Sequence, residues 1–253
     1  MDMNTALDAL GVREDTLSAA EKTHLDTQGF LVLPAILSPD QLSAIGQRLD
    51  ELLGLEGDQA GLEVHQEQGT ERLANLVNKG AIFAVCFTHP RVLAAVAQVI
   101  GHPFRLSSLN SRGALPGQGA QGFHVDWAKA TVAAGDYYAC NTAWLLDPFT
   151  IKNGPTRVVP GSHRSDQTIA EAMPDPKAPH PDEIQVIAPA GSVLVFNAHL
   201  WHSGTLNYSA QRRRVVHAYF GRRTHPQQTD QRAHLAPETY GRLSEAARYL
   251  LDV

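Results

Sequence analysis

The sequence predicts one all-β domain over residues 1–253, a barrel or jelly roll flanked by helices. A length of 253 residues suits a single large β domain. The second half holds several short apolar segments separated by turn residues, while the first half has a long segment of helical period. We expect a helical region at about residues 1–103, the jelly-roll core at about 104–225 and a C-terminal helix at about 236–251.

Two helices are expected in the first half. Ser38 can cap a helix whose first residue is Pro39, and Gln41 stands at the capping-box position. Leucine and isoleucine then recur at helical spacing, and Gly54 is expected to end this helix. A second helix is expected over residues 90–100.

Short apolar segments are expected to form strands. Turn residues at 153–155 and 189–191 separate several of them. Many short strands at close intervals favour an antiparallel barrel over a parallel sheet. The expected strands cover residues 30–34, 104–112, 138–146, 184–187, 192–196 and 214–220.

The composition is that of an ordinary enzyme. The chain has 26 acidic and 21 basic residues, a net charge of −5, so no nucleic-acid partner is expected. Cys86 and Cys140 are expected to be buried free thiols in a reducing compartment. The N-terminus has no signal-peptide pattern, and no apolar run reaches the roughly 20 residues of a membrane helix. We therefore expect a cytoplasmic monomer or homodimer that binds a small molecule and no membrane.

His124 and Asp126 form an H-x-D pair. Residues two apart in a strand point to the same face, so the imidazole and the carboxylate can converge on one metal ion. Two histidines and one carboxylate that leave three positions open are typical of non-haem iron(II) oxygenases. The third ligand must then come from a distant strand.

His202 is the candidate third ligand. It follows an apolar strand, and Arg213 lies 11 residues further on, at the start of the next strand. An arginine fork suits a bidentate carboxylate, and an arginine inside a barrel needs such a partner. His199 competes, but the residue at the same offset from it is an alanine. Arg212 and Arg214 alternate with Arg213 and should face outward.

Several motifs together resemble one enzyme family. They are residues 116–118, the residues Gln121, His124, Asp126 and Trp127, the N-G-x-T-x-x-x-P-G-S-H stretch at 153–163, the run 191–213, and residues 29–32. These motifs resemble the phytanoyl-CoA dioxygenase superfamily of iron(II)- and 2-oxoglutarate-dependent oxygenases. The resemblance implies a double-stranded β-helix, which is a cupin-like jelly roll.

The resemblance also implies the reaction. His124, Asp126 and His202 would be the catalytic iron(II) ligands, with 2-oxoglutarate and O2 as cosubstrates. A small-molecule metabolite would be hydroxylated, desaturated or cyclised, with release of succinate and CO2. The carboxylate of Asp126 argues against halogenation, because related halogenases have a small residue there.

Three residues are expected to bind 2-oxoglutarate. Arg213 and Thr156 would hold the carboxylate far from the metal, and Gln121 would assist. The resemblance leaves a further asparagine open, either Asn75 or Asn110.

Trp127 is the candidate substrate contact. It lies just past the metal motif, where the chain should leave the barrel mouth, so we expect a partly aromatic or apolar metabolite and not a CoA thioester. Arg112, near the same mouth, could meet a carboxylate or phosphate, but a surface salt bridge is expected.

Two other function classes remain open. One is a cupin-like metalloenzyme of non-oxidative chemistry, such as a lyase or an isomerase, which would leave Arg213 and Gln121 without a role. The other is a non-catalytic jelly-roll module that binds a metabolite, and three intact metal ligands argue against it.

Overall fold

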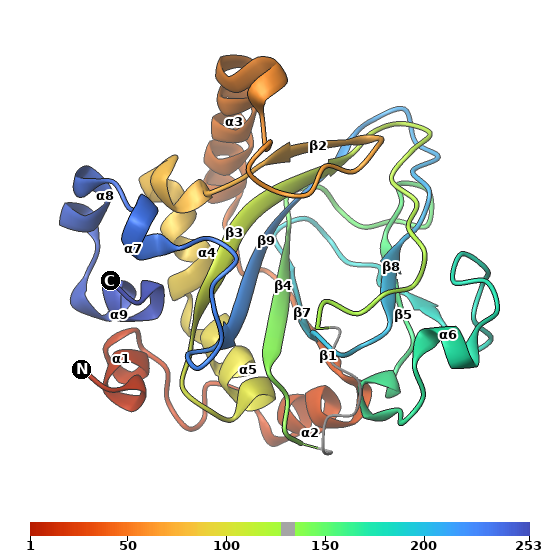
Figure 1. Cartoon of the computed structure of the whole chain (residues 1–253), viewed down its shortest axis with the longest axis horizontal. Helices are drawn as coiled ribbons and strands as arrows, with labels where there is room; N and C mark the ends of the chain where they lie inside the picture. The colour runs from red at the N-terminus through yellow and green to blue at the C-terminus, as the bar shows by residue number, and fades with distance from the viewer. Residues whose placement is uncertain (128–134) are drawn as a thin grey trace.

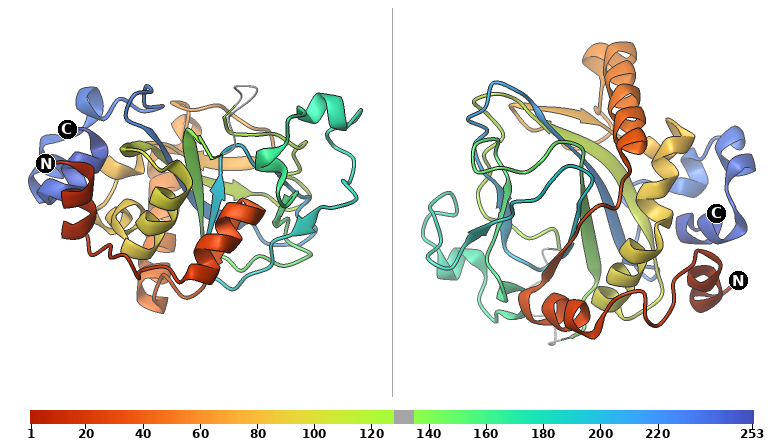
Figure 2. Two further views of the ribbon diagram at one scale, coloured as in Figure 1. Left: turned by 90° about the horizontal axis from the view of Figure 1, so that it is seen from below. Right: turned by 180° about the vertical axis from the view of Figure 1, so that it is seen from behind.

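Two antiparallel sheets form the centre of the protein. The structure, a computed structural model, describes residues 1–127 and 135–253. The larger sheet has the strand order β1-β7-β4-β9-β3-β2, and the smaller has the order β6-β5-β8. Figure 1 shows most of the helices on one side of the larger sheet and the smaller sheet, with α6 (Ile169–Ala172) beside it, on the other. Both views of Figure 2 repeat this arrangement.

The strands are β1 (Phe30–Leu33), β2 (Thr70–Leu73), β3 (Phe104–Ala114), β4 (Ala139–Leu145), β5 (Thr156–Val158), β6 (Ile184–Gln185), β7 (Val193–Asn197), β8 (His202–Gly204) and β9 (Arg213–Arg222). The α-helices are α1 (Met3–Ala9), α2 (Ala19–Gln28), α3 (Pro39–Glu56), α4 (Val85–Thr88), α5 (Pro90–Ile100), α6 (Ile169–Ala172), α7 (Gln231–His234), α8 (Pro237–Arg242) and α9 (Glu245–Leu251).

Helix α3 begins as predicted and ends later than predicted. Ser38 accepts a hydrogen bond from the backbone of Gln41, and Pro39 is the first helical residue. Gly54 does not end the helix, because an interior glycine costs only about 1 kcal/mol relative to alanine. Gly57, at a φ of 52°, ends the helix instead.

Helix α5 covers the outer face of the larger sheet. It has the predicted bounds, and Gly101 ends it in the left-handed conformation. Its apolar face packs on β4 and β7. Within the described ranges, no single helix is long and apolar enough to span a membrane; residues 81–88 and 90–100 reach that length and composition only as a pair bent by 44°.

The sequence missed three strands. β2, β5 and β8 have three or four residues each, too few to show a period. β1 and β2 join the larger sheet, so the first 103 residues are not only helical. The C-terminal segment forms two short helices, because Ser244 starts a new cap between α8 and α9.

The two sheets enclose an apolar core at one end and a polar space at the other. Cys86 and Cys140 are both buried free thiols, as predicted. The register of β3 against β9 aligns polar residues along the inner face of the larger sheet. Asn110 is aligned with His217 and Ser108 with Tyr219, while Arg112 is aligned with the apolar Val215. The inner apolar cluster comprises Phe30, Ala143, Leu145, Phe149, Val158, Val186, Ala188, Leu194, Phe196, Leu200 and Val215.

Candidate metal centre

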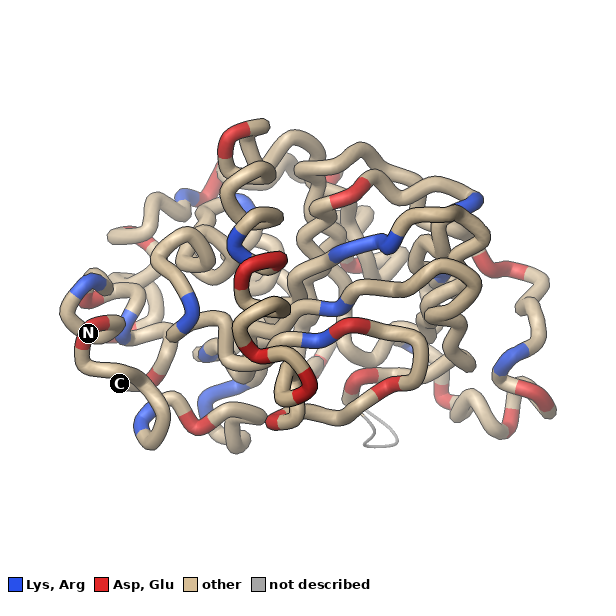
Figure 3. Tube along the Cα trace, turned by 90° about the horizontal axis from the view of Figure 1, so that it is seen from above, with Lys and Arg blue, Asp and Glu red and all other residues tan. Residues whose placement is uncertain are grey.

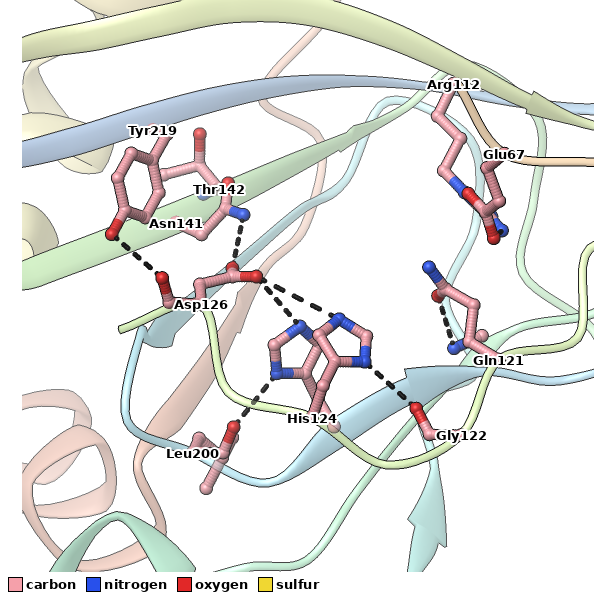
Figure 4. A network of polar contacts seen from close by, with 12 residues as sticks. Glu67, Arg112, Gln121, Gly122, His124, Asp126, Asn141, Thr142, Leu200 and Tyr219 are labelled. Atoms are coloured by element: carbon pink, nitrogen blue, oxygen red, sulfur yellow. Dashed lines mark hydrogen bonds and ion pairs between the residues drawn. The ribbon is translucent and has the colours of Figure 1, made fainter. Parts of the chain in front are cut away.

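Three side chains converge between the sheets. Oδ1 of Asp126 lies 3.9 Å from Nε2 of His124 and 3.6 Å from Nε2 of His202. One ligand atom from each residue lies within 4.8 Å of the other two. Figure 4 shows both imidazoles pointing toward the same carboxylate oxygen. One ion can therefore contact all three atoms, which come from the two parts of the chain that the sequence predicted.

Backbone carbonyls orient both imidazoles. Nδ1 of His124 lies 3.0 Å from the carbonyl oxygen of Gly122, and Nδ1 of His202 lies 2.9 Å from that of Leu200. A carbonyl only accepts, so each Nδ1 carries the proton. The lone pair of each Nε2 is then free for a metal, as in most histidine metal sites.

The backbone also joins the two ligand segments. The N–H of His124 donates to the carbonyl of His202 at 3.0 Å, and the N–H of His202 donates back at 3.1 Å. This isolated antiparallel bridge brings the ring centroids to 4.3 Å. The separation of the two imidazoles is therefore fixed by the main chain.

Asn141 positions the carboxylate. Its amide donates to Oδ2 of Asp126 at 2.7 Å, while its own oxygen accepts from the backbone N–H of Thr142 at 2.8 Å. Burial alone would raise the pKa of Asp126, but His202, His124 and Asn141 together lower it. The carboxylate is thus held ionised, with Oδ1 left for the metal.

Arg213 is a buried cation without an anionic partner among the described residues. It is 2% exposed and makes no hydrogen bond or ion pair to any residue in the described ranges. Its guanidinium lies 4.6 Å from the ring centroid of Phe149. Burial lowers the pKa of Arg213 to about 9, and Arg112 adds to this. An anionic ligand at this position would stabilise the charge.

The side chains of Arg212 and Arg214 point away from the cavity, as strand alternation predicted. Arg212 pairs with Asp50 and Glu71, and Arg214 binds Asp147 at 3.0 Å. Figure 3 shows acidic and basic residues interspersed along the described part of the trace. Asp147 thus contacts Arg214 and makes no ion pair with Arg213, although its charge partly offsets the lowering of the pKa of Arg213.

A cavity of about 210 Å³ connects these groups. Besides the three candidate ligands and Arg213, its lining includes Gln121, Thr156 and Asn110. Oε1 of Gln121 accepts from the N–H of Gly204 at 3.0 Å. Asn75 does not line the cavity, but its N–H donates to Oδ1 of Asn110 at 3.1 Å. Of the two asparagines left open by the sequence, only Asn110 faces the site.

Two residues predicted near the mouth have other contacts. Arg112 forms a salt bridge, a bidentate pair with Glu67 at 2.8 and 2.7 Å (Figure 4), but the pair is buried at the cavity wall and not on the surface as expected. Trp127 stacks on Tyr138 with a centroid distance of 5.4 Å and is not among the described lining residues. Substrate contact by Trp127 thus stays a prediction without support from the cavity.

Sequence reasoning missed several polar lining residues. Asn141 was detectable, since it is the polar residue at an inward position of an apolar strand. His217 is half-buried, its buried Nδ1 has no partner in the described ranges, and desolvation lowers its pKa to about 3. Arg72 and Gln228 carried no signal, because a four-residue strand and a loop after β9 bring them to the cavity.

Comparison with known proteins agrees with this geometry. The sequence model for the phytanoyl-CoA dioxygenase (PhyH) family matches residues 25–215. L-proline trans-4-hydroxylase of Streptomyces griseoviridis is 29% identical over 237 residues, with 80% of this chain and 86% of that protein covered. Dioxygenase af480 of Aspergillus fumigatus is 26% identical over 218 residues, with 83% and 69% covered.

Solved structures share the fold. HygX from Streptomyces hygroscopicus, with nickel and 2-oxoglutarate bound, superposes with a TM-score of 0.67 at 17% identity and covers 83% of this chain and 89% of its own. The α-ketoglutarate-dependent carbocyclase SnoK from nogalamycin biosynthesis gives 0.66 at 20% identity, covering 82% and 85%. The fold of the chain is therefore the jelly roll of such oxygenases.

Proposed function

Because the chain belongs to the phytanoyl-CoA dioxygenase (PhyH) family and is thus an iron(II)- and 2-oxoglutarate-dependent dioxygenase, we propose that it hydroxylates a small-molecule metabolite. His124, Asp126 and His202 are the proposed iron ligands. The observation that carries the assignment is the convergence of two unprotonated Nε2 atoms and one carboxylate oxygen beside a buried, unpaired arginine.

The donor set fits iron(II) with 2-oxoglutarate. Two imidazoles and one carboxylate occupy one side of an ion and leave room for a chelating cosubstrate and oxygen. The bound group supplies oxidation of a substrate C–H bond, with conversion of 2-oxoglutarate to succinate and CO2. What the chain itself contributes is the placing of the cosubstrate and of that bond.

Arg213 and Thr156 are the proposed holders of the distal carboxylate of 2-oxoglutarate. Arg213 offers a guanidinium fork to the cavity, and the ring of Phe149 packs against this guanidinium. Thr156 adds a hydroxyl from β5. Gln121, held by the backbone of Gly204, directs its amide nitrogen to the same space. Burial of the cation without an anionic partner among the described residues supports this role, because a carboxylate satisfies it.

A small-molecule substrate is supported by the size of the cavity and by the relatives. The space of about 210 Å³ lies inside the barrel and is lined by side chains on all the central strands. One relative is named an L-proline trans-4-hydroxylase, and HygX has been solved with hygromycin B bound. Hydroxylation is the proposed outcome, and desaturation or ring closure would begin with the same C–H bond.

Succinate release tests the proposal. Purified protein with iron(II) and 2-oxoglutarate is expected to release succinate in the presence of particular metabolites from a panel. The matched control is Arg213→Met, which should need far more 2-oxoglutarate. An enzyme that consumes substrate equally well without 2-oxoglutarate would contradict the assignment.

A further inference from the structure

Arg72 places a positive charge on the cavity wall that is only partly neutralised. Its Nη1 lies 3.2 Å from Oε2 of Glu67, but the same carboxylate already accepts two shorter hydrogen bonds from Arg112. Nε of Arg72 is buried and has no partner in the described ranges. One carboxylate therefore serves two guanidinium groups, and the weaker contact is that of Arg72.

Two amide groups add donors to the same wall. Oδ1 of Asn110 accepts from the N–H of Asn75 at 3.1 Å, and Oε1 of Gln228 accepts from the hydroxyl of Ser108 at 2.6 Å. Neither amide nitrogen donates to a residue in the described ranges, and both side chains line the cavity. With the oxygens engaged, each amide offers N–H groups to whatever occupies the space.

Arg72 and Arg213 mark two separate positions for an anion. Arg72 is on the edge strand β2, opposite Arg112 on β3, and Arg213 is on β9, the next strand inward. The Arg112–Glu67 pair, satisfied within itself, lies between them. A carboxylate of 2-oxoglutarate at Arg213 would thus leave the excess charge at Arg72 in place.

We propose that the substrate bears a carboxylate and that Arg72 is its anchor, with Asn110 and Gln228 donating hydrogen bonds beside it. This inference rests on the proposed function. If 2-oxoglutarate binds at Arg213, the second anion position, at Arg72, is left for the substrate. An apolar neutral substrate would bury the three donor groups without acceptors, which is costly. The polar lining therefore adds a carboxylate to the partly aromatic or apolar metabolite expected from the sequence.

Matched acid and amide pairs test the anchor. L-proline, L-phenylalanine, hexanoate and benzoate, each paired with its primary amide, are titrated by calorimetry into anaerobic protein loaded with iron(II) and 2-oxoglutarate. At least one acid is expected to bind at least about 10-fold more tightly than its amide, the size of one charge-assisted hydrogen bond. Arg72→Met should lose that preference and keep the affinity for 2-oxoglutarate.

Two variants control for charge and folding. Arg212→Met removes a surface arginine that pairs with Asp50 and Glu71, and it should leave both affinities unchanged. Arg72→Lys retains the charge without the fork and should bind the acid with intermediate affinity. Glu67 stays paired with Arg112 in both Arg72 variants, which favours an intact fold.

The other outcomes contradict either the role of Arg72 as the anchor or the proposed function. Equal affinities for acids and amides, no binding of any acid, or an unchanged preference in Arg72→Met would exclude the anchor. A parallel loss of 2-oxoglutarate affinity in Arg72→Met would assign Arg72 to the cosubstrate and also exclude it. Failure of the wild type to bind 2-oxoglutarate would instead contradict the proposed function, and it is detected in the loading step before any acid is added.

Discussion

Asn141 donates a hydrogen bond to the carboxylate oxygen of Asp126 that faces away from the two histidines, at 2.7 Å. The contact crosses from β4 to the loop that bears the H-x-D pair. The contact fixes which oxygen of Asp126 faces the metal position. Asn141, which is not itself a proposed ligand, therefore orients one that is.

Loss of this contact should weaken metal binding. Asn141→Ala is expected to lower the affinity for iron(II) by about 10- to 100-fold, the usual effect of removing an outer partner of a ligand. Anaerobic titration with iron(II) or cobalt(II) measures it. Asn4→Ala, on an exposed helical turn, is the control. Equal affinities in the two variants would show that Asp126 needs no support.

The ligand assignment predicts opposite results for two nearby histidines. His202→Ala should abolish turnover and metal binding with the fold intact, as should Asp126→Ala. His199→Ala should remain active, because His199 contacts the backbone of Tyr138 and not the centre. Succinate release measures the activity of each variant, and circular dichroism checks that it is folded. An inactive His199→Ala beside an active His202→Ala would reverse the assignment.

Substitution of Arg213 should weaken the binding of 2-oxoglutarate without lowering the stability of the fold. Arg213→Met is expected to raise the 2-oxoglutarate requirement by roughly 10- to 150-fold, corresponding to a charged hydrogen bond of about 1.5–3 kcal/mol. Arg212→Met and Arg214→Met should change it little. Without ligands, Arg213→Met should unfold at the same or a higher urea concentration, because it removes an unpaired buried charge. Equal kinetic effects from all three arginines would mean that they act as a surface patch.

His199 makes the metal-free protein sensitive to mild acid. Burial lowers the pKa of His199 from 6.5 to about 4. Between these two values the imidazole is protonated in the unfolded chain but not in the folded one. The contribution is fully present above pH 6.5, is lost as the pH falls toward 4, and amounts to on the order of 3 kcal/mol. Urea unfolding at pH 7 and pH 5 measures it. His199→Gln should reduce the difference; an unchanged difference would assign the acid sensitivity to other groups.

Local patterns predicted the parts of the site that lie close in sequence. Strand alternation identified Arg213 as the inward arginine, and the H-x-D spacing identified His124 and Asp126. Arg72 and Gln228 could not be predicted, since their positions depend on how an edge strand and a distant loop pack. Gly54 was wrong as a helix end, because one interior glycine costs a helix only about 1 kcal/mol.

Because β2 is an edge strand, residues that bind the substrate can change during evolution without changes at the metal centre. β2 pairs only with β3, whereas β9 and β4 each have two partners and meet the metal centre. A peripheral strand tolerates altered side chains, insertions or a shifted register at small cost to the sheet. Selection for a new substrate can therefore act on β2 and the loops around it, while the oxidative chemistry inside the barrel is inherited unchanged.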